Sequence, residues 1–161
     1  MKGYHKQFML DDAKLRIISW ISTGIGSLDA LYLSWVKIAH SQVYCGTSGQ
    51  CETVNNSPYS VIGGVPIAFL GLGAYLVVLA LLYLENRSGF WQENVSLLVF
   101  GVSLVGVIFS AYLTYLEIWV IHAICPYCVV SAICMLVLFL TSILRLRQDQ
   151  TVIKPIRSRG G

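Results

Sequence analysis

The feature that most constrains this chain is a series of four long apolar stretches. They cover residues Ile17–Ile38, Val65–Leu84, Val95–Ile118 and Tyr127–Leu146. A helix of about 20 apolar residues crosses the roughly 30 Å hydrocarbon core of a bilayer. Only 12% of the residues are charged, against about 25% in soluble domains. We therefore predict an all-α membrane protein, a four-transmembrane-helix bundle, in which residues 1–161 form a single domain.

The three connections between these stretches differ in length and polarity. The first, Ala39–Gly64, is long and polar and contains two cysteines. The second, Glu85–Asn94, is a short polar turn, and the third is reduced to His122–Pro126. We expect the long first loop to lie on the same side of the membrane as the short third connection, because two helices separate them.

The basic residues predict the orientation in the membrane. Lys37 alone would lie on the side of the long loop, whereas ten of the eleven lie on the other side: Lys2, Lys6, Lys14, Arg16, Arg87, Arg145, Arg147, Lys154, Arg157 and Arg159. Loops rich in Lys and Arg stay in the cytoplasm. We therefore expect both termini to be cytoplasmic and the cysteine pairs to be extracytoplasmic. The first stretch lacks a signal-peptide cleavage site, so we expect it to remain as a helix.

Cys125-Pro126-Tyr127-Cys128 is the most specific motif in the chain. Two cysteines at this spacing can approach within one helical turn, and proline is favoured at the first position of a helix. Backbone N–H groups at a helix start favour the thiolate, the reactive form of cysteine. Cys134, about two turns into the fourth stretch, is expected to be a buried apolar residue.

Cys45 and Cys51 form a second pair, separated by five residues that include two glycines. We expect a disulfide here to be accessible to a protein partner, since it lies in a polar loop. An accessible pair together with a membrane-embedded pair suggests an electron relay between a water-soluble thiol and a lipid-soluble oxidant. Two alternatives stay open: two static disulfides in a non-enzymatic membrane adaptor, and a structural zinc site, which the oxidising side of a membrane disfavours.

The sequence resembles the vitamin K epoxide reductase family over nearly its whole length. The resemblance lies in Cys51-Glu-Thr-Val-Asn-Asn-Ser57-Pro-Tyr, in Gly64-Val-Pro66, and in a Cys-x-x-Cys motif that opens the fourth apolar stretch. The five-residue spacing of the loop cysteines and Ala132, four residues after Cys128, are typical of the bacterial, archaeal or plant-type homologues rather than of the vertebrate enzyme.

The resemblance implies a quinone-dependent thiol oxidoreductase that forms disulfides in a thioredoxin-like partner on the outer side. Cys125 and Cys128 would be the active-site pair, with Cys128 and Ser57 at a quinone of the ubiquinone, menaquinone or phylloquinone type. Cys45 would exchange with the partner, and Cys51 with Cys125. The alternative physiological role is reduction of vitamin K epoxide or quinone. We expect no metal, no nucleic-acid partner and a monomer surrounded by membrane lipid.

Three further polar residues lie within or near the predicted helices. Asp29 is close to the middle of the first stretch, where a carboxyl group is costly and usually functional. We expect it either to bond a neighbouring helix, through Tyr112 or Ser110, or to act near the site. Glu117 and His122 lie near the active-site pair, where His122 is either a proton acceptor or a histidine exposed at the interface.

Overall fold

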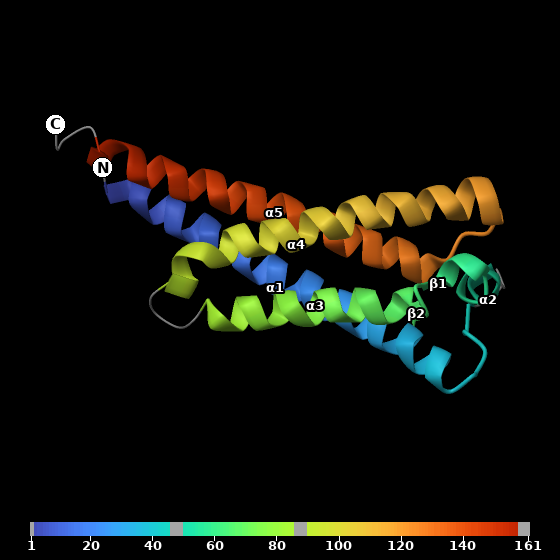
Figure 1. The fold of residues 1–161 in the computed structure, drawn as a ribbon. Coiled ribbons are helices and arrows are strands. Elements are labelled where there is room, and N and C mark those ends of the chain that lie inside the picture. The colour runs from blue at the N-terminus through green and yellow to red at the C-terminus, as the bar shows by residue number, and fades with distance from the viewer. Residues whose placement is uncertain (1, 46–49, 86–89, 158–161) are drawn as a thin grey trace.

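The computed structural model describes residues 2–45, 50–85 and 90–157. Its four long helices are α1 (Lys2–Ile38), α3 (Ile67–Leu84), α4 (Phe90–Tyr115) and α5 (Pro126–Arg157). Helix α1 packs against α3 and α5, and α4 packs against the same two helices. The start of α1 and the end of α5 lie at one end of this bundle, and the segment between α1 and α3 lies at the other (Figure 1). Arg87, Arg159 and residues 46–49 of the loop lie outside the described residues.

The segment between α1 and α3 contains short regular elements that the sequence did not predict. They are α2 (Gln50–Asn55), the 3₁₀ turn η1 (Pro58–Ser60) and two strands, β1 (Val61–Ile62) and β2 (Val65–Pro66). The strands pair antiparallel around Gly63 and Gly64, whose φ angles of 58° and 85° suit a tight hairpin turn. Helix α3 therefore begins at Ile67, two residues after the predicted start.

The other long helices also differ from the predicted stretches at their ends. Helix α1 begins at Lys2 and α5 continues to Arg157. Helix α4 passes into a π-helical turn, η2 (Leu116–Ile121), which ends at His122 in the left-handed conformation with φ of 56°. Among the described residues, three helices are long and apolar enough to cross a membrane: Ile67–Leu84, Asn94–Ile121 and Pro126–Gln148.

Helix α1 is less apolar than these three because it carries a row of hydroxyl groups. These groups face the other helices: Ser19, Ser22, Thr23 and Ser34 are all buried. Ser19 shares a hydrogen bond of 3.1 Å with Thr141 of α5. The outward positions are apolar and exposed, at Ile17, Ile21, Ile25, Leu28, Leu31 and Trp35. A helix with its polar side inward and its apolar side outward is suited to lipid rather than to water.

The main core lies between the helices and extends toward the end opposite the cysteines. Its largest fully buried side chains are Tyr75, Leu82, Leu138, Val78 and Val95. The Tyr75 ring passes so close to Gly26 that a Cβ there would lie 2.2 Å from it. Glycine at position 26 therefore lets α1 and α3 approach each other closely.

An ion-pair cluster joins three helices at this end of the bundle. The Arg145 guanidinium of α5 pairs with the Glu85 carboxylate at the end of α3 and, at 3.1 Å, with Asp12 of α1. The Arg145 and Glu85 side chains are 10% and 8% exposed. Because Arg145 and Glu85 are both nearly buried, loss of either one would leave an uncompensated buried charge, which is not the case for a surface pair.

Candidate functional site

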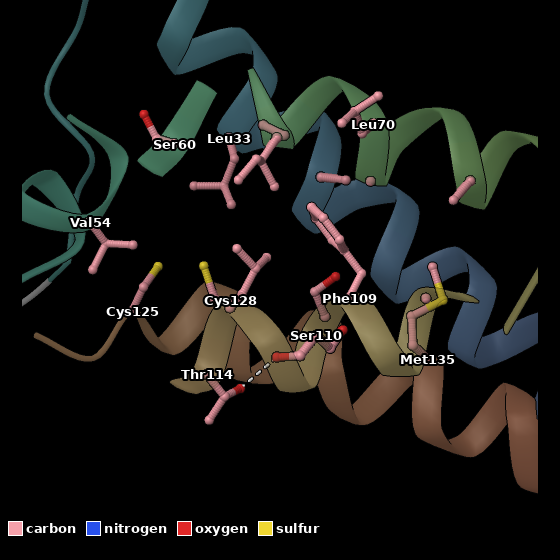
Figure 2. Close-up of a pocket in the computed structure, with 18 of the residues that line it drawn as sticks. Leu33, Val54, Ser60, Leu70, Phe109, Ser110, Thr114, Cys125, Cys128 and Met135 are labelled. Carbon is pink, nitrogen blue, oxygen red and sulfur yellow. Dashed lines mark hydrogen bonds between the residues drawn. The ribbon is translucent and has the colours of Figure 1, made fainter. Parts of the chain in front are cut away.

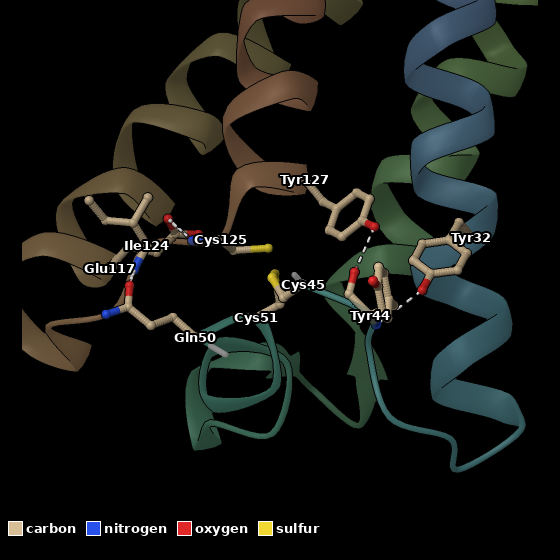
Figure 3. The surroundings of a disulfide bond; sticks show 9 residues. All are labelled: Tyr32, Tyr44, Cys45, Gln50, Cys51, Glu117, Ile124, Cys125 and Tyr127. Carbon is tan, nitrogen blue, oxygen red and sulfur yellow. Dashed lines mark hydrogen bonds between the residues drawn. A yellow bond between two sulfur atoms is a disulfide. The ribbon is translucent and has the colours of Figure 1, made fainter. Parts of the chain in front are cut away.

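A second buried cluster lies at the opposite end of the bundle, and cysteines form much of it. Cys51 and Cys125 are 0% and 2% exposed, and Cys45 and Cys128 pack against them. Figure 3 shows the Cys125 sulfur pointing toward the Cys45–Cys51 disulfide. The structure thus brings together four cysteines that the sequence places in two motifs some 75 residues apart, because α2 packs against η2 and its Gln50 bonds the Ile124 N–H just before α5.

The two pairs differ in bonding and in exposure. Cys45 and Cys51 form a disulfide, whereas Cys125, Cys128 and Cys134 are free thiols. The expectation of an accessible loop disulfide was wrong for one of its two sulfurs. Cys51 is completely buried on α2, and only Cys45 is partly exposed. The physical reason is that Cys51 lies on the apolar side of α2, against Val36, Val43 and Cys125.

The backbone just before α5 is held by two side-chain contacts. The Glu117 carboxylate accepts a hydrogen bond of 3.3 Å from the Cys125 N–H, and the Gln50 side chain accepts one of 3.0 Å from the Ile124 N–H. Glu117 is 4% exposed and also interacts with the Cys128 thiol. Glu117 lies in η2, and π-helical turns often occur at functional sites, where they redirect a side chain.

Three tyrosines connect the cysteine motif to the loop pair. The Tyr127 hydroxyl donates a hydrogen bond of 2.9 Å to the Tyr44 carbonyl, and the Tyr44 N–H donates one of 3.2 Å to the Tyr32 hydroxyl. The Tyr32 and Tyr127 rings lie 5.2 Å apart between centroids. Since Tyr44 directly precedes Cys45, these contacts fix the loop disulfide relative to Cys125 (Figure 3).

The pKa of Cys125 is lowered from the ordinary thiol value. A hydrogen bond from the Cys128 thiol is the largest cause, and the backbone N–H groups of Cys128 and Tyr127 act in the same direction. Burial and the nearby Glu117 carboxylate oppose the effect. Stabilisation of the thiolate at a helix start is the physical basis of reactive cysteines, so Cys125 is the better nucleophile of the pair.

A cavity of about 630 Å³ extends from the cysteines into the bundle between the four long helices. Figure 2 shows Cys125, Cys128 and Val54 at one end, Phe109 of α4 in the middle and Met135 of α5 at the other end. The walls are mostly carbon. The volume and the apolar lining of this cavity are typical of a site that binds a small ligand, since such pockets usually have volumes of about 300–1,000 Å³.

Some of the remaining candidates from the sequence line this cavity, and others do not. Ser57 lines it and donates a hydrogen bond of 2.8 Å to the Val54 carbonyl. Asp29 also lines it, but its buried Oδ2 has no hydrogen-bond partner, and Tyr112 is half-exposed. The expected bond from Asp29 to a neighbouring helix is therefore missing at this oxygen. His122 is exposed at the end of η2.

Several residues of the site were missed from the sequence. Gln50, Tyr32 and Tyr44 gave no signal, because their contacts depend on how the loop folds. Glu117 was expected near the active-site pair, but its contact with the Cys125 N–H was not predicted. Lys37 at the end of α1 also had no predicted contact, but it donates hydrogen bonds to the Asn55 carbonyl and to Ser60, and so holds the loop next to the cavity.

Comparison with known proteins defines the class. Residues 17–143 match the vitamin K epoxide reductase family. The chain is also similar to the thiol-disulfide oxidoreductase LTO1 of Arabidopsis thaliana, with 34% identity over 134 residues, which cover 78% of this chain and 36% of that protein. The chain thus spans about a third of the length of this relative. It belongs to the vitamin K epoxide reductase family and, with its apolar helices, is an integral membrane protein.

Proposed function

We propose that this protein is a membrane thiol oxidoreductase that takes electrons from a thioredoxin-like protein and gives them to a quinone. One observation carries the proposal: Cys125 faces the Cys45–Cys51 disulfide on one side, while Cys128 lines the apolar cavity on the other. The similarity to a thiol-disulfide oxidoreductase supports the same reaction class. Two static disulfides would need neither the cavity nor the contact between the pairs.

The first transfer takes place at the partly exposed end of the loop pair. A dithiol of the partner attacks Cys45, the partner becomes a disulfide, and Cys45 and Cys51 become thiols. Cys51 is buried against Cys125, so its thiolate attacks the Cys125 sulfur of a Cys125–Cys128 disulfide and Cys128 leaves as a thiolate. Cys45 then attacks Cys51, which restores the loop disulfide and releases Cys125.

The proposed second transfer would leave the same pattern of bonded and free cysteines as the structure has. The loop pair is oxidised and the pair at the start of α5 is reduced. From here two electrons and two protons pass to the quinone, which becomes a quinol, while Cys125 and Cys128 form a disulfide. The quinone supplies only the oxidising power. The mostly apolar walls of the cavity would surround it, and Cys128 and Ser57 would lie at its head group.

We also propose that α1 is the fourth membrane-spanning helix, and that the bundle has a defined orientation in the membrane. The exposed apolar side of α1 supports the crossing. The basic residues Lys14, Arg16, Arg145 and Arg147 belong to the end of the bundle opposite the cysteines. Under the positive-inside rule this end is cytoplasmic, which places both termini in the cytoplasm and both cysteine pairs outside.

Trapping the intermediate tests the relay. In a variant with Cys45→Ser and Cys128→Ser, the only partners left at the site are Cys51 and Cys125, so we expect a Cys51–Cys125 disulfide in peptide maps of non-reduced protein. A matched variant with Cys51→Ser and Cys128→Ser should instead leave Cys125 reduced. Absence of the Cys51–Cys125 bond in correctly folded protein would contradict the proposed route.

A further inference from the structure

Among the polar groups that line the cavity and have no part in the proposed electron route, one has a buried oxygen without a hydrogen-bond partner. This group is Asp29 of α1, and the oxygen is its Oδ2. An unpartnered buried carboxyl oxygen is unfavourable, and more so within apolar surroundings. Residues retained at such a cost in a membrane protein usually meet a ligand or a second polar group.

The position of Asp29 is suited to the far end of a quinone head group. Leu33, one turn nearer the cysteines, packs with the cluster around Cys51 and Cys125, whereas Ala30 belongs to the main core. Four residues of helix rise about 6 Å. Asp29 therefore lies roughly one helical turn deeper in the cavity than the level of Leu33.

Several hydroxyl groups in the cavity wall already donate their hydrogen bonds within the protein. Quinone carbonyl oxygens only accept hydrogen bonds, so they need a donor. The hydroxyl of Ser57 donates to the Val54 carbonyl, and that of Thr114 donates to the Ser110 carbonyl. Ser131 shares its hydroxyl with Tyr75, whose own hydroxyl donates to the Ser131 carbonyl. A carboxylic acid at Asp29 is neutral at little cost in this environment and has an O–H to donate.

We propose that Asp29, as a neutral acid, donates a hydrogen bond to the quinone carbonyl that lies farther from Cys128. This inference rests on the proposed function and adds a second contact between the protein and the quinone head group. Cys128 meets one side of the head group, and Asp29 holds the opposite side. Asp29 is then a binding residue that selects acceptors with a carbonyl at both ends over acceptors with only one.

The test compares Asp29→Leu with Asp29→Asn in the purified full chain, with dithiothreitol as electron donor and a short-chain ubiquinone or menaquinone as acceptor. Leucine removes the donor, so KM for the quinone should rise about tenfold, which corresponds to about 1.4 kcal/mol, with kcat changed much less. Asparagine keeps a donor, so its KM should stay within about threefold of the wild-type value. Ser27→Ala is the matched control, since Ser27 is also an unpartnered residue of α1 but does not line the cavity.

Thermal unfolding separates a binding role from a structural one. Without quinone, Asp29→Leu should unfold at the same temperature as wild type or higher, because an unpartnered polar group is removed. At the same quinone concentration, the unfolding temperature of wild type and Ser27→Ala should rise more than that of Asp29→Leu. If the leucine variant does not fold, Asp29→Ala takes its place.

Each outcome decides between the claims. A wild-type KM and a quinone-induced stabilisation equal to that of wild type in Asp29→Leu would overturn the assignment of Asp29 while leaving the proposed function intact. An equal loss in Asp29→Asn and Asp29→Leu would overturn the hydrogen-bond role. If wild-type protein neither reduces the quinones nor is stabilised by them, the proposed function itself fails, and this inference fails with it.

Discussion

The two ends of the bundle are held together in different ways. At the end of Arg145, helices pack through large apolar side chains and a buried ion pair. At the end of Cys125, sulfur atoms occupy the buried positions, a cavity separates the helices, and side-chain contacts to the loop backbone replace close packing. We infer that packing at the Arg145 end stabilises the bundle, and that this stability allows the Cys125 end to keep a cavity for the reaction. Changes at the two ends should therefore affect different measurements.

The largest effect is expected at the cysteine end, from Cys128→Ala. The variant lacks the thiol that lines the cavity, so no disulfide can form with Cys125 and quinone reduction should fall by a factor of about 1,000 or more. Quinol formation measured by absorbance, with dithiothreitol as donor, checks this. Cys134→Ala is the control and should keep near-normal turnover, since Cys134 is a buried thiol that does not line the cavity. Normal turnover in Cys128→Ala would contradict the role of Cys128, whereas no turnover in wild type would favour the stapled, non-enzymatic alternative.

The opposite end is tested by Arg145→Met, which leaves Glu85 buried without its partner. Loss of one member of a buried pair costs about 3–5 kcal/mol, so unfolding in detergent should require markedly less denaturant. The double variant Arg145→Met with Glu85→Met should recover most of this loss. Turnover per folded molecule should stay the same in both variants. Lost turnover at unchanged stability would contradict the division of roles between the two ends.

A smaller effect is expected from Tyr127→Phe, which keeps the ring against Tyr32 but removes the hydrogen bond to the Tyr44 carbonyl. The loop disulfide should then be placed less accurately against Cys125. We expect turnover with a reduced thioredoxin-like donor to fall about fivefold, since one hydrogen bond contributes about 1 kcal/mol. Turnover with dithiothreitol in a Cys45→Ala, Cys51→Ala background should change little. Equal losses in both assays would indicate a general structural role instead.

The smallest effect concerns the pH dependence of Cys125. Its pKa is lowered chiefly by the hydrogen bond from Cys128, so the thiolate persists to lower pH than an ordinary thiol allows. Removal of that donor in Cys128→Ala should shift the alkylation profile of Cys125 to higher pH. Iodoacetamide labelling of reduced protein lacking Cys45, Cys51 and Cys134 measures it. A shift to lower pH would contradict the assigned cause.

The sequence predicted the parts of the site whose signal is local. The apolar stretches, the Cys-Pro-Tyr-Cys motif and the loop pair could each be recognised from neighbouring residues. The contact of Glu117 with the Cys125 N–H could not, because it depends on the π-helical turn before His122. The burial of Cys51 depends on α2, a helix of six residues that is stabilised by the surface it covers rather than by its own sequence.

The most direct test of the account counts the quinol formed when fully reduced protein is mixed anaerobically with excess ubiquinone or menaquinone. Four thiols in two pairs hold four electrons, so wild type should yield about two quinols per chain. A Cys45→Ala, Cys51→Ala variant should yield about one, because only the pair at the start of α5 remains. Equal yields from the two proteins would contradict the relay between the pairs, and no quinol from wild type would contradict the quinone-linked function itself.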